Sequence, residues 1–346
     1  MQALVPTDIR QLEACFAAAK RVSIVVHTHP DGDALGSGTA MLAYLRQCRG
    51  LDARLLLPEA GPASLDFVLP ADSWIDAARE PEAARAWIAG CDLIICQDMN
   101  AFNRAEALAP ALAASSARKV LIDHHLNPDR EAFDLVFSET EISSACELLY
   151  RVLLALPGVG EPAKLPMQVL TALMTGMTTD TNNFANSVFP STLQMASELL
   201  AAGVDRNALL EQLYQQYREN RLRAMGAFLS ECMTVRPDGV AFAVLHRDFL
   251  RRFDIQEGET EGFVNLPLGI GGVRISVLLR EDENHFRVSI RSKAGVSANR
   301  LATEAFHGGG HEQAAGGKLF FPQDISSPAE AEDYVSAVTA RFMRNQ

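Results

Sequence analysis

The sequence contains no run of eighteen or more apolar residues, and its first 20 residues lack the basic and then apolar pattern of a secretory signal. Its six cysteines form no CxxC pair and no spacing typical of a disulfide framework. These absences argue against a membrane-spanning helix, a visible export signal and a zinc ribbon. We therefore expect a cytoplasmic protein without a membrane partner, in which the cysteines are reduced and structural.

Positive charge is also scarce, because 31 Lys and Arg stand against 43 Asp and Glu, for a formal net charge of -12. Nonspecific binding of long nucleic acids depends on Lys and Arg that neutralise phosphates, so this balance argues against a general polyanion-binding surface. An anionic substrate must instead meet a local basic pocket. The length of 346 residues and the apolar content of 48% allow two domains, each with its own core.

Short apolar runs alternate with helical patterns up to about residue 200. Such alternation predicts βαβ units and a parallel sheet, in which ligands bind beyond the carboxyl ends of the strands. The expected strands cover 22–26, 53–57, 93–96 and 120–122, and the expected helices cover 34–48, 81–89, 104–115, 144–155, 167–175, 191–202 and 205–234.

The pattern changes after the turn signal Arg-Pro-Asp-Gly at 236–239. Strands are expected at 240–245, 273–280 and 286–290, the last two as a hairpin, and a helix at 328–343 closes the chain. We predict an α/β protein with a parallel-sheet N-terminal domain and a smaller α/β C-terminal domain with a mixed sheet. The predicted boundaries are 1–200 for the first domain, 201–235 for a helical connection and 236–346 for the second domain.

Three of the expected strands end directly before His or Asp residues. One runs into His-Thr-His-Pro-Asp-Gly-Asp at 27–33, another ends next to Asp98, and a third ends before Asp-His-His at 123–125. Several clustered carboxylates without a counter-charge would repel one another, so the cluster implies bound metal, and carboxylates with imidazoles suit divalent cations such as manganese. For the first segment we favour metal ligation over a simple Asx turn.

Three residues fit more than one role when each is considered alone. His29 fits an outer partner of a metal ligand as well as a solvated loop histidine, and we leave it out of the ligand set. Asp98 alone would more often cap a helix, but its alignment with the other strand ends favours a carboxylate that bridges two metals. Asp180 alone is typical of a helix-end cap.

A glycine-rich segment at 308–317, Gly-Gly-Gly-His-Glu-Gln-Ala-Ala-Gly-Gly, fits neither of two common motifs. It is no P-loop, because Leu319 follows Lys318 where Ser or Thr is required, and it is no HExxH motif, because Ala315 fills the place of the second histidine. The alternatives are a backbone that approaches a ligand closely and a flexible surface loop. The basic residues before it supply either a local positive pocket or a solvated charged face.

Together these segments resemble the DHH phosphoesterase family, in the two-domain branch whose second domain carries a Gly-Gly-Gly-His signature. The resemblance covers nearly the whole chain and points to the stand-alone nano-RNases that also remove phosphate from 3'-phosphoadenosine 5'-phosphate. It implies one metal ion on His27, Asp31 and Asp98. It implies a second ion on Asp33, Asp98, His124 and Asp180.

The resemblance also implies roles in catalysis and substrate binding. His125 would face the scissile phosphate and Asp123 would orient the histidine pair, so Asp98, Asp123 and His125 are the expected catalytic residues. The second domain would be the DHH-associated substrate-binding domain. Its expected substrate-binding residues are Arg291 and Arg300 for phosphate, and Gly308, Gly309, Gly310 and His311 for the terminal nucleotide.

The expected cofactors are two divalent ions, with manganese favoured by the family and magnesium, cobalt or iron also compatible with the ligands. The expected substrates are short RNA oligonucleotides and the nucleotide bisphosphate, with either cleavage polarity. Two alternatives remain. One is a phosphodiesterase of cyclic di-AMP or linear pApA, and the other is a nucleotide-binding regulator that has lost catalysis, whose expected mark would be a missing ligand.

Overall fold

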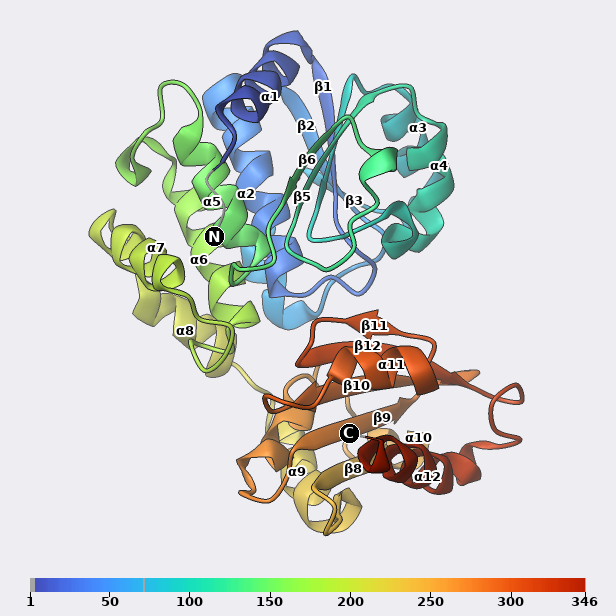
Figure 1. Ribbon diagram of the computed structural model, residues 1–346. Helices are drawn as coiled ribbons and strands as arrows, with labels where there is room; N and C mark the ends of the chain where they lie inside the picture. Colours follow the sequence, from blue (N-terminus) through green and yellow to red (C-terminus); the bar gives the residue numbers. More distant parts are fainter. Residues whose placement is uncertain (1–3, 71, 346) are drawn as a thin grey trace. The chain divides into compact units, whose positions relative to one another are not determined.

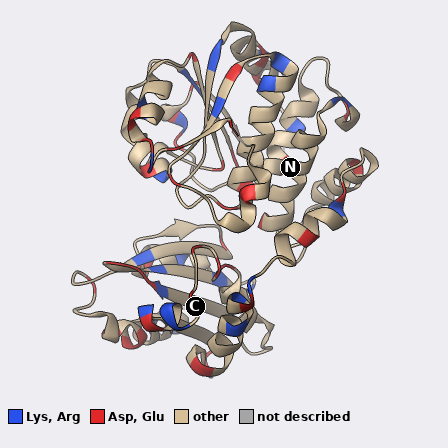
Figure 2. Ribbon diagram, turned by 180° about the vertical axis from the view of Figure 1, so that it is seen from behind, with Lys and Arg blue, Asp and Glu red and all other residues tan. Residues whose placement is uncertain are grey.

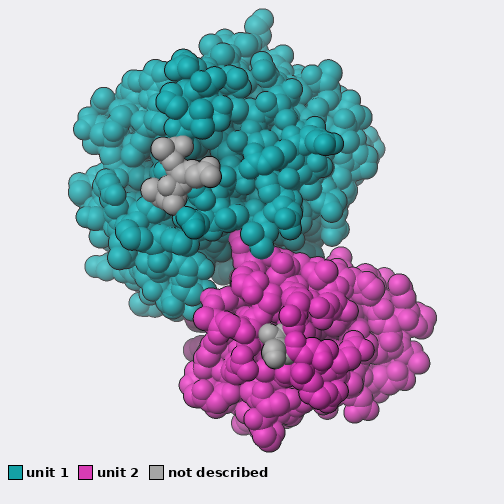
Figure 3. All heavy atoms as spheres, viewed as in Figure 1, with its two compact units in different colours: residues 1–216 teal, residues 217–346 magenta. Residues whose placement is uncertain are grey.

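The computed structural model describes residues 4–70 and 72–345, and the chain divides into two compact units, residues 1–216 and 217–346 (Figure 3). No export signal is expected in the N-terminal segment, and residues 1–3 of that segment lie outside the described residues. In the part that the structure describes, every helix is too short or too polar to cross a membrane.

The first unit is built on a six-stranded parallel sheet in the order β3-β2-β1-β4-β5-β6 (Figure 1). The order reverses between β1 and β4, and a crevice opens at such a switch point beyond the carboxyl ends of the strands. The predicted parallel α/β fold is confirmed. The strands are β1 (Arg21–Val25), β2 (Asp52–Leu57), β3 (Trp74–Asp76), β4 (Leu93–Gln97), β5 (Arg118–Asp123) and β6 (Leu135–Ser138).

Helices cover both faces of this sheet, as parallel strands require. One face packs against α1 (Pro6–Ala18), α2 (Gly32–Arg49), α5 (Ala145–Ala155) and α6 (Met167–Asp180), whose apolar side chains share one core with the sheet. The other face packs against α3 (Pro81–Ala89), the 3-10 helix η2 (Phe102–Leu108) and α4 (Ala109–Ala114). The helices α7 (Pro190–Ala201) and α8 (Arg206–Tyr214) add to the first core.

Two of the expected helices are wrong as continuous elements. The segment expected as one helix at 104–115 consists of the 3-10 helix η2, which Glu106 interrupts with a φ of 37°, and the short helix α4. The helix expected at 205–234 is broken into α8, α9 (Glu219–Ala227) and a π-type turn. Before α9 the backbone of Arg218 is extended, and its guanidinium lies 2.5 Å from Asp254 Oδ2.

The second unit has a six-stranded mixed sheet in the order β11-β12-β10-β9-β8-β7, in which only β8 and β9 are parallel. The predicted mixed sheet and the hairpin of β9 and β10 are confirmed. The strands are β7 (Thr234–Val235), β8 (Val240–Leu245), β9 (Ile275–Glu281), β10 (His285–Ser292), β11 (Gly309–Gly310) and β12 (Ala314–Phe320).

Strand β10 alternates strictly between buried and half-buried residues. Its buried apolar side chains, Phe286, Val288 and Ile290, share a core with α11 (Ala298–Ala305) and α12 (Ala331–Arg344). The opposite face carries Arg287 and Arg291, and Figure 2 shows the basic positions on this sheet in blue. On the β8 and β9 side, that opposite face is covered by α9, α10 (Arg247–Arg252) and the 3-10 helix η6 (Phe263–Gly269).

Candidate metal centre

The loop after β1 supplies the first group of polar side chains. His27 follows the strand, and Asp31 caps α2, because its Oδ1 accepts hydrogen bonds from the backbone N–H groups of Asp33 at 3.0 Å and Ala34 at 3.1 Å. Gly32 leaves room for Thr179, since a Cβ at this position would lie 2.3 Å from Thr179 Oγ1. The loop is therefore fixed by its own sequence against the end of α6.

The carboxylate of Asp33 is held by the N-terminus of α5. Its Oδ2 accepts a hydrogen bond from the N–H of Ala145 at 2.6 Å, and its Oδ1 accepts one from the N–H of Cys146 at 3.0 Å. The positive end of a helix dipole stabilises a carboxylate in this position. Ser144 begins α5 as a capping residue, because its side chain accepts from the N–H of Glu147.

Glycine lets α6 approach this carboxylate. A Cβ on Gly176 would lie 2.7 Å from Asp33 Oδ1 and 2.3 Å from Cys146 Sγ, and a Cβ on Gly36 would lie 2.6 Å from Ala172 O. The close contact of α2 with α6 therefore depends on both glycines. It carries Asp180, the last residue of α6, to the carboxyl ends of the strands.

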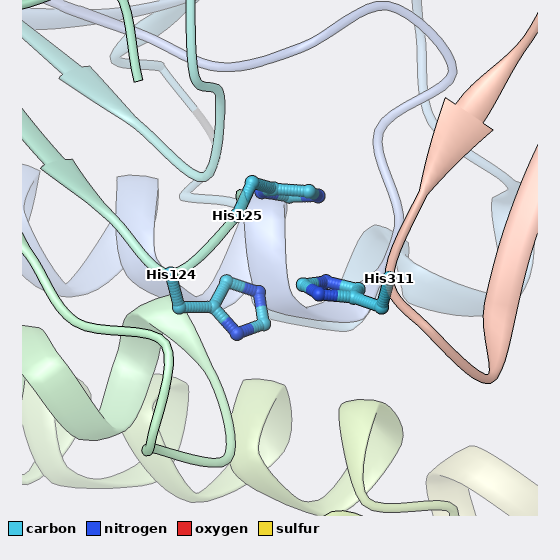
Figure 4. A group of neighbouring side chains, drawn as sticks. All are labelled: His124, His125 and His311. Carbon is cyan, nitrogen blue, oxygen red and sulfur yellow. The ribbon is translucent and has the colours of Figure 1, made fainter. Parts of the chain in front are cut away.

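Two further strand ends complete the centre. Asp98 follows β4 with a φ of 55°, and its N–H donates to Ile122 O of β5 at 3.1 Å. At the end of β5, Asp123 is buried and its Oδ1 lies 2.8 Å from Nδ1 of His125. Figure 4 shows His124 and His125 projecting from the segment that follows this strand.

Two of the metal-compatible groups that these side chains form lie on either side of Asp98, and a further group consists of Asp98, Asp123 and His125. In the first group, His27 Nε2 lies 3.5 Å from Asp98 Oδ2 and 3.8 Å from Asp31 Oδ1. In the second group, His124 Nε2 lies 3.7 Å from Asp33 Oδ2 and 3.6 Å from Asp180 Oδ2.

Asp98 presents one carboxylate oxygen to each group. Its Oδ2 faces His27 of the first group, and its Oδ1 lies 3.3 Å from His124 Nε2 of the second group. His125 Nδ1 is also within 3.6 Å of that oxygen. A carboxylate with this placement can bridge two cations. All six positions that the sequence predicts as metal ligands lie in these two groups.

The acids of the centre disturb one another's protonation. Burial raises the pKa of Asp33, and the carboxylates of Asp98 and Asp180 raise it further. Burial also raises the pKa of Asp180 to about 6. Burial acts in the same direction on Asp98, but His124 and His27 outweigh it and hold the pKa of Asp98 well below its usual range.

The pKa values of the two buried histidines are also raised, but by neighbouring acids rather than by burial. Burial lowers the pKa of His27, but the neighbouring Asp98 outweighs burial and raises that pKa to about 9. The pKa of His124 is also raised, because Asp98 and Asp180 outweigh the effect of burial. Positive charge on the imidazoles therefore balances part of the acidic cluster, and a divalent cation would displace these protons on binding.

The donor set fits divalent metal ions. Asp98 Oδ1 and Asp123 Oδ2 are buried and accept no hydrogen bond from the described residues, which is costly unless a cation or water satisfies them. Carboxylate oxygens and imidazole nitrogens are ligands for manganese, magnesium, iron and cobalt. Four ligating aspartates would also balance the charge of two dications.

Comparisons with known proteins give the family of this site. The model of the DHH family, N-terminal domain, matches residues 21–177, and the model of the DHHA1 domain matches residues 238–338. A bifunctional oligoribonuclease and PAP phosphatase NrnA of Thermus thermophilus is 31% identical over 313 residues, which cover 89% of this chain and 86% of that protein. The chain belongs to the DHH family.

Other known proteins are also similar over most of this chain. A Bacillus subtilis protein with the same name is 28% identical, over 86% of this chain and 90% of its own length. The solved structure of an exopolyphosphatase-related protein from Bacteroides fragilis has a TM-score of 0.90 at 33% identity, over 99% and 98% of the two chains. The exonuclease RecJ bound to manganese, at 16% identity and a TM-score of 0.53, shares the fold, over 99% and 97% of the two chains.

The glycines that the sequence assigns to substrate lie in the DHHA1 unit, at β11 and its hairpin with β12. A Cβ on Gly308 would lie 1.9 Å from Gly316 O, and Gly310 has a φ of 144°, so packing of the hairpin alone requires both glycines. A Cβ on Gly309 would meet nothing closer than Asn299 Oδ1 at 3.5 Å. Gly309 is therefore the glycine of the signature with open space beside it.

The other expected substrate-binding residues, His311, Arg291 and Arg300, lie on three different elements of this unit. His311 lies in the hairpin turn, and its N–H donates to Ala314 O at 2.7 Å. Arg291 lies on β10, on the face opposite the core of the unit. Arg300 lies on α11, where its guanidinium stacks over Phe342 at 4.7 Å and pairs with Glu304 at 3.4 Å.

Sequence reasoning missed the residues that hold the ligands in place. Ser144 and Glu147 form a Ser-x-x-Glu pattern before an apolar helix, and this signal predicts the α5 N-terminus that binds Asp33. Glu147 is buried, and its Oε2 accepts from Ser143 Oγ at 2.5 Å and Thr192 Oγ1 at 2.7 Å. Gly176 gave no signal in the sequence, because its role depends on a contact between two helices.

Proposed function

We propose that this DHH protein is a two-metal phosphoesterase that hydrolyses short oligoribonucleotides and removes phosphate from 3'-phosphoadenosine 5'-phosphate, with manganese as its metal. The observation that carries the proposal is the position of Asp98, whose two oxygens face two separate groups of ligands. The choice of substrate is supported by relatives that are named as oligoribonuclease and PAP phosphatase and that are similar to this chain over most of their length.

The residues assigned to the two ions are those of the two groups. His27, Asp31 and Asp98 would hold one ion. Asp33, Asp98, His124 and Asp180 would hold the other. Two adjacent dications supply a Lewis-acidic centre and make water a better nucleophile at neutral pH. The α5 N-terminus keeps the Asp33 carboxylate oriented toward the second group.

His125 would act on the phosphate itself. Nδ1 of His125 donates a hydrogen bond to the Asp123 carboxylate. This bond fixes the tautomer of the ring and leaves Nε2 to contact a phosphate oxygen. From Nε2 the oriented ring would offset the charge that develops on the phosphate oxygens during attack. We assign His125 to substrate and Asp123 to its orientation.

The DHHA1 unit would bind the part of the substrate away from the reacting phosphate. Arg291 provides a guanidinium that can bind phosphate in a bidentate way. Gly309 provides a backbone that a nucleotide can approach closely, and His311 in the turn beside it provides a ring for stacking or hydrogen bonding. Such local sites suit a chain with a net charge of -12, which has little attraction for long nucleic acids.

A second candidate is a phosphodiesterase of cyclic di-AMP or linear pApA. A cyclic-di-AMP phosphodiesterase GdpP of Geobacillus thermodenitrificans is 27% identical over 89% of this chain, but the match spans only 46% of that protein. Comparing hydrolysis of cyclic di-AMP with that of linear pApA distinguishes the candidates, because a site that requires a terminal phosphate rejects the ring.

Hydrolysis of di- to pentanucleotides and of the bisphosphate, with manganese added, tests the proposal. Asp98→Asn should lower kcat by about 100-fold or more, because it removes a charge that both ions need. Asp92→Asn is a matched aspartate control that should keep activity, because Asp92 precedes β4 and its carboxylate bonds to Lys20 and Arg21 at the start of β1, the end opposite to the candidate site. Absence of hydrolysis of both substrate classes by the parent would refute the proposal.

A further inference from the structure

The backbone of the loop that carries His27 and Asp31 is held from outside the motif at two successive amides. The N–H of Thr28 donates to Arg104 O at 2.8 Å, and the N–H of His29 donates to Glu59 Oε1 at 2.8 Å. Arg104 contributes a backbone atom that many residues could provide. Glu59 contributes a side chain, so its identity matters for the loop.

The backbone of His29 has a conformation that such a partner helps to hold. Its φ is 56°, in the left-handed region that few residues other than glycine adopt, although asparagine, aspartate and histidine do so more often than the rest. The same Glu59 oxygen also contacts Nδ1 of the His29 ring. One carboxylate thus binds the backbone and the ring of the residue that stands midway between two expected metal ligands.

The segment that carries Glu59 also packs against the loop. A Cβ on Gly61 would lie 2.9 Å from Leu35 Cδ1 and 3.6 Å from the Cγ and O atoms of Pro30. This segment follows β2, which lies beside β1 on the side away from β4. The ligand loop is therefore held on one side by residues after β4 and on the other by residues after β2.

We propose that Glu59 is a positioning residue of the metal centre, which holds His29 in its left-handed conformation and so directs His27 and Asp31 toward their common ion. This inference rests on the proposed function only in that it requires the chain to bind metal. Outer partners of this kind orient the ligands, and their loss weakens metal binding without removing a ligand.

Calorimetric titration of the metal-free full-length protein with Mn²⁺ alone tests the inference. Glu59→Ala should weaken binding of one of the two ions about 10- to 100-fold. Glu59→Gln should restore affinity close to that of the parent, because the amide oxygen still accepts from the His29 N–H. Equal weakening by Gln and Ala would overturn the positioning role, since the negative charge of Glu59 would then be responsible.

Asp92→Ala is the matched control. Asp92 Oδ2 accepts from the N–H groups of Lys20 at 2.8 Å and Arg21 at 2.9 Å, so this carboxylate ties the opposite end of β1. Asp92→Ala should lower thermal stability and leave Mn²⁺ affinity unchanged. Equal weakening in both alanine variants would overturn the inference, as would parent affinity in Glu59→Ala. A parent that binds no Mn²⁺ would refute the proposed function as well.

Discussion

The carboxylate of Asp33 accepts a hydrogen bond from the N–H of Cys146, a residue 113 positions later in the chain, at 3.0 Å. Asp33 follows β1, and Cys146 lies in the first turn of α5. Formation of the metal centre therefore requires α2, α5 and α6 to be packed together. Stability of the first unit and geometry of the centre depend on the same contacts.

Gly176→Ala tests this dependence. The added Cβ would overlap Cys146 Sγ and Asp33 Oδ1, so we expect a loss of about 1–3 kcal/mol in the free energy of unfolding of the first unit, together with weaker Mn²⁺ binding. Denaturant titration measures the first effect. Gly226→Ala is the control, because a Cβ at Gly226 in α9 meets no atom within 4 Å, and this substitution should be neutral or stabilising.

Metal removal should destabilise the first unit. Without cations, four carboxylates of the centre face one another, and two of them are almost fully buried, Asp33 and Asp98. Mn²⁺ at 100 times its dissociation constant should add about 2.7 kcal/mol per site, which corresponds to a rise of about 5–10 °C in Tm. Differential scanning calorimetry with and without chelator measures this shift. An unchanged Tm would contradict metal binding at the centre.

Asp123→Asn separates catalysis from metal binding. The variant leaves every assigned ligand in place but weakens the orientation of His125, which is bonded to Asp123 Oδ1 at 2.8 Å. We expect kcat on a dinucleotide to fall about 10- to 1,000-fold with an unchanged number of bound Mn²⁺ ions. Loss of an ion in this variant would instead place Asp123 among the ligands.

Glu257 provides a test of pH dependence in the second unit. Burial raises its pKa, but Arg280 and Arg287, paired with it across β9 and β10, outweigh burial and lower the pKa. A carboxylate whose pKa is lower in the folded state than in the unfolded state stabilises the fold at pH values above its unfolded-state pKa of about 4.3. This stabilisation is lost as the pH falls through the folded-state pKa.

Glu257→Gln should therefore destabilise the second unit at pH 7, by no more than about 1 kcal/mol because the carboxylate is partly exposed. The difference from the parent should vanish at acidic pH, below the folded-state pKa. Urea titrations across this range measure it. A difference that is equal at neutral and acidic pH would show that charge is not its cause.

The sequence predicted the convergence of the acidic and histidine side chains more fully than the elements around them, and their binding of metal stays a prediction. His27, Asp98 and Asp123 follow buried strands, and parallel strands bring their carboxyl ends to one edge, so the cluster could be inferred from local patterns. The strands β3 and β6 were missed, because they are only three and four residues long and carry little periodicity.

Residues that act through distant contacts could not be predicted. Glu59 lies in an ordinary-looking loop, and its importance depends on the conformation of His29 rather than on its own neighbours in sequence. The glycines of the 308–310 signature looked like ligand contacts, yet packing of the β11–β12 hairpin accounts for two of them. The predicted domain boundaries stay predictions, and the experiments described above test the predicted roles of individual ligands.

The number of Mn²⁺ ions bound per chain tests the central claim most directly. Titration calorimetry on the metal-free parent, checked by elemental analysis after dialysis, should give two ions per chain. Asp98→Asn should lose high-affinity binding of both, because one carboxylate serves both groups. A parent that binds one ion or none, or an Asp98→Asn variant that retains two tightly bound ions, would contradict a bridged two-metal centre.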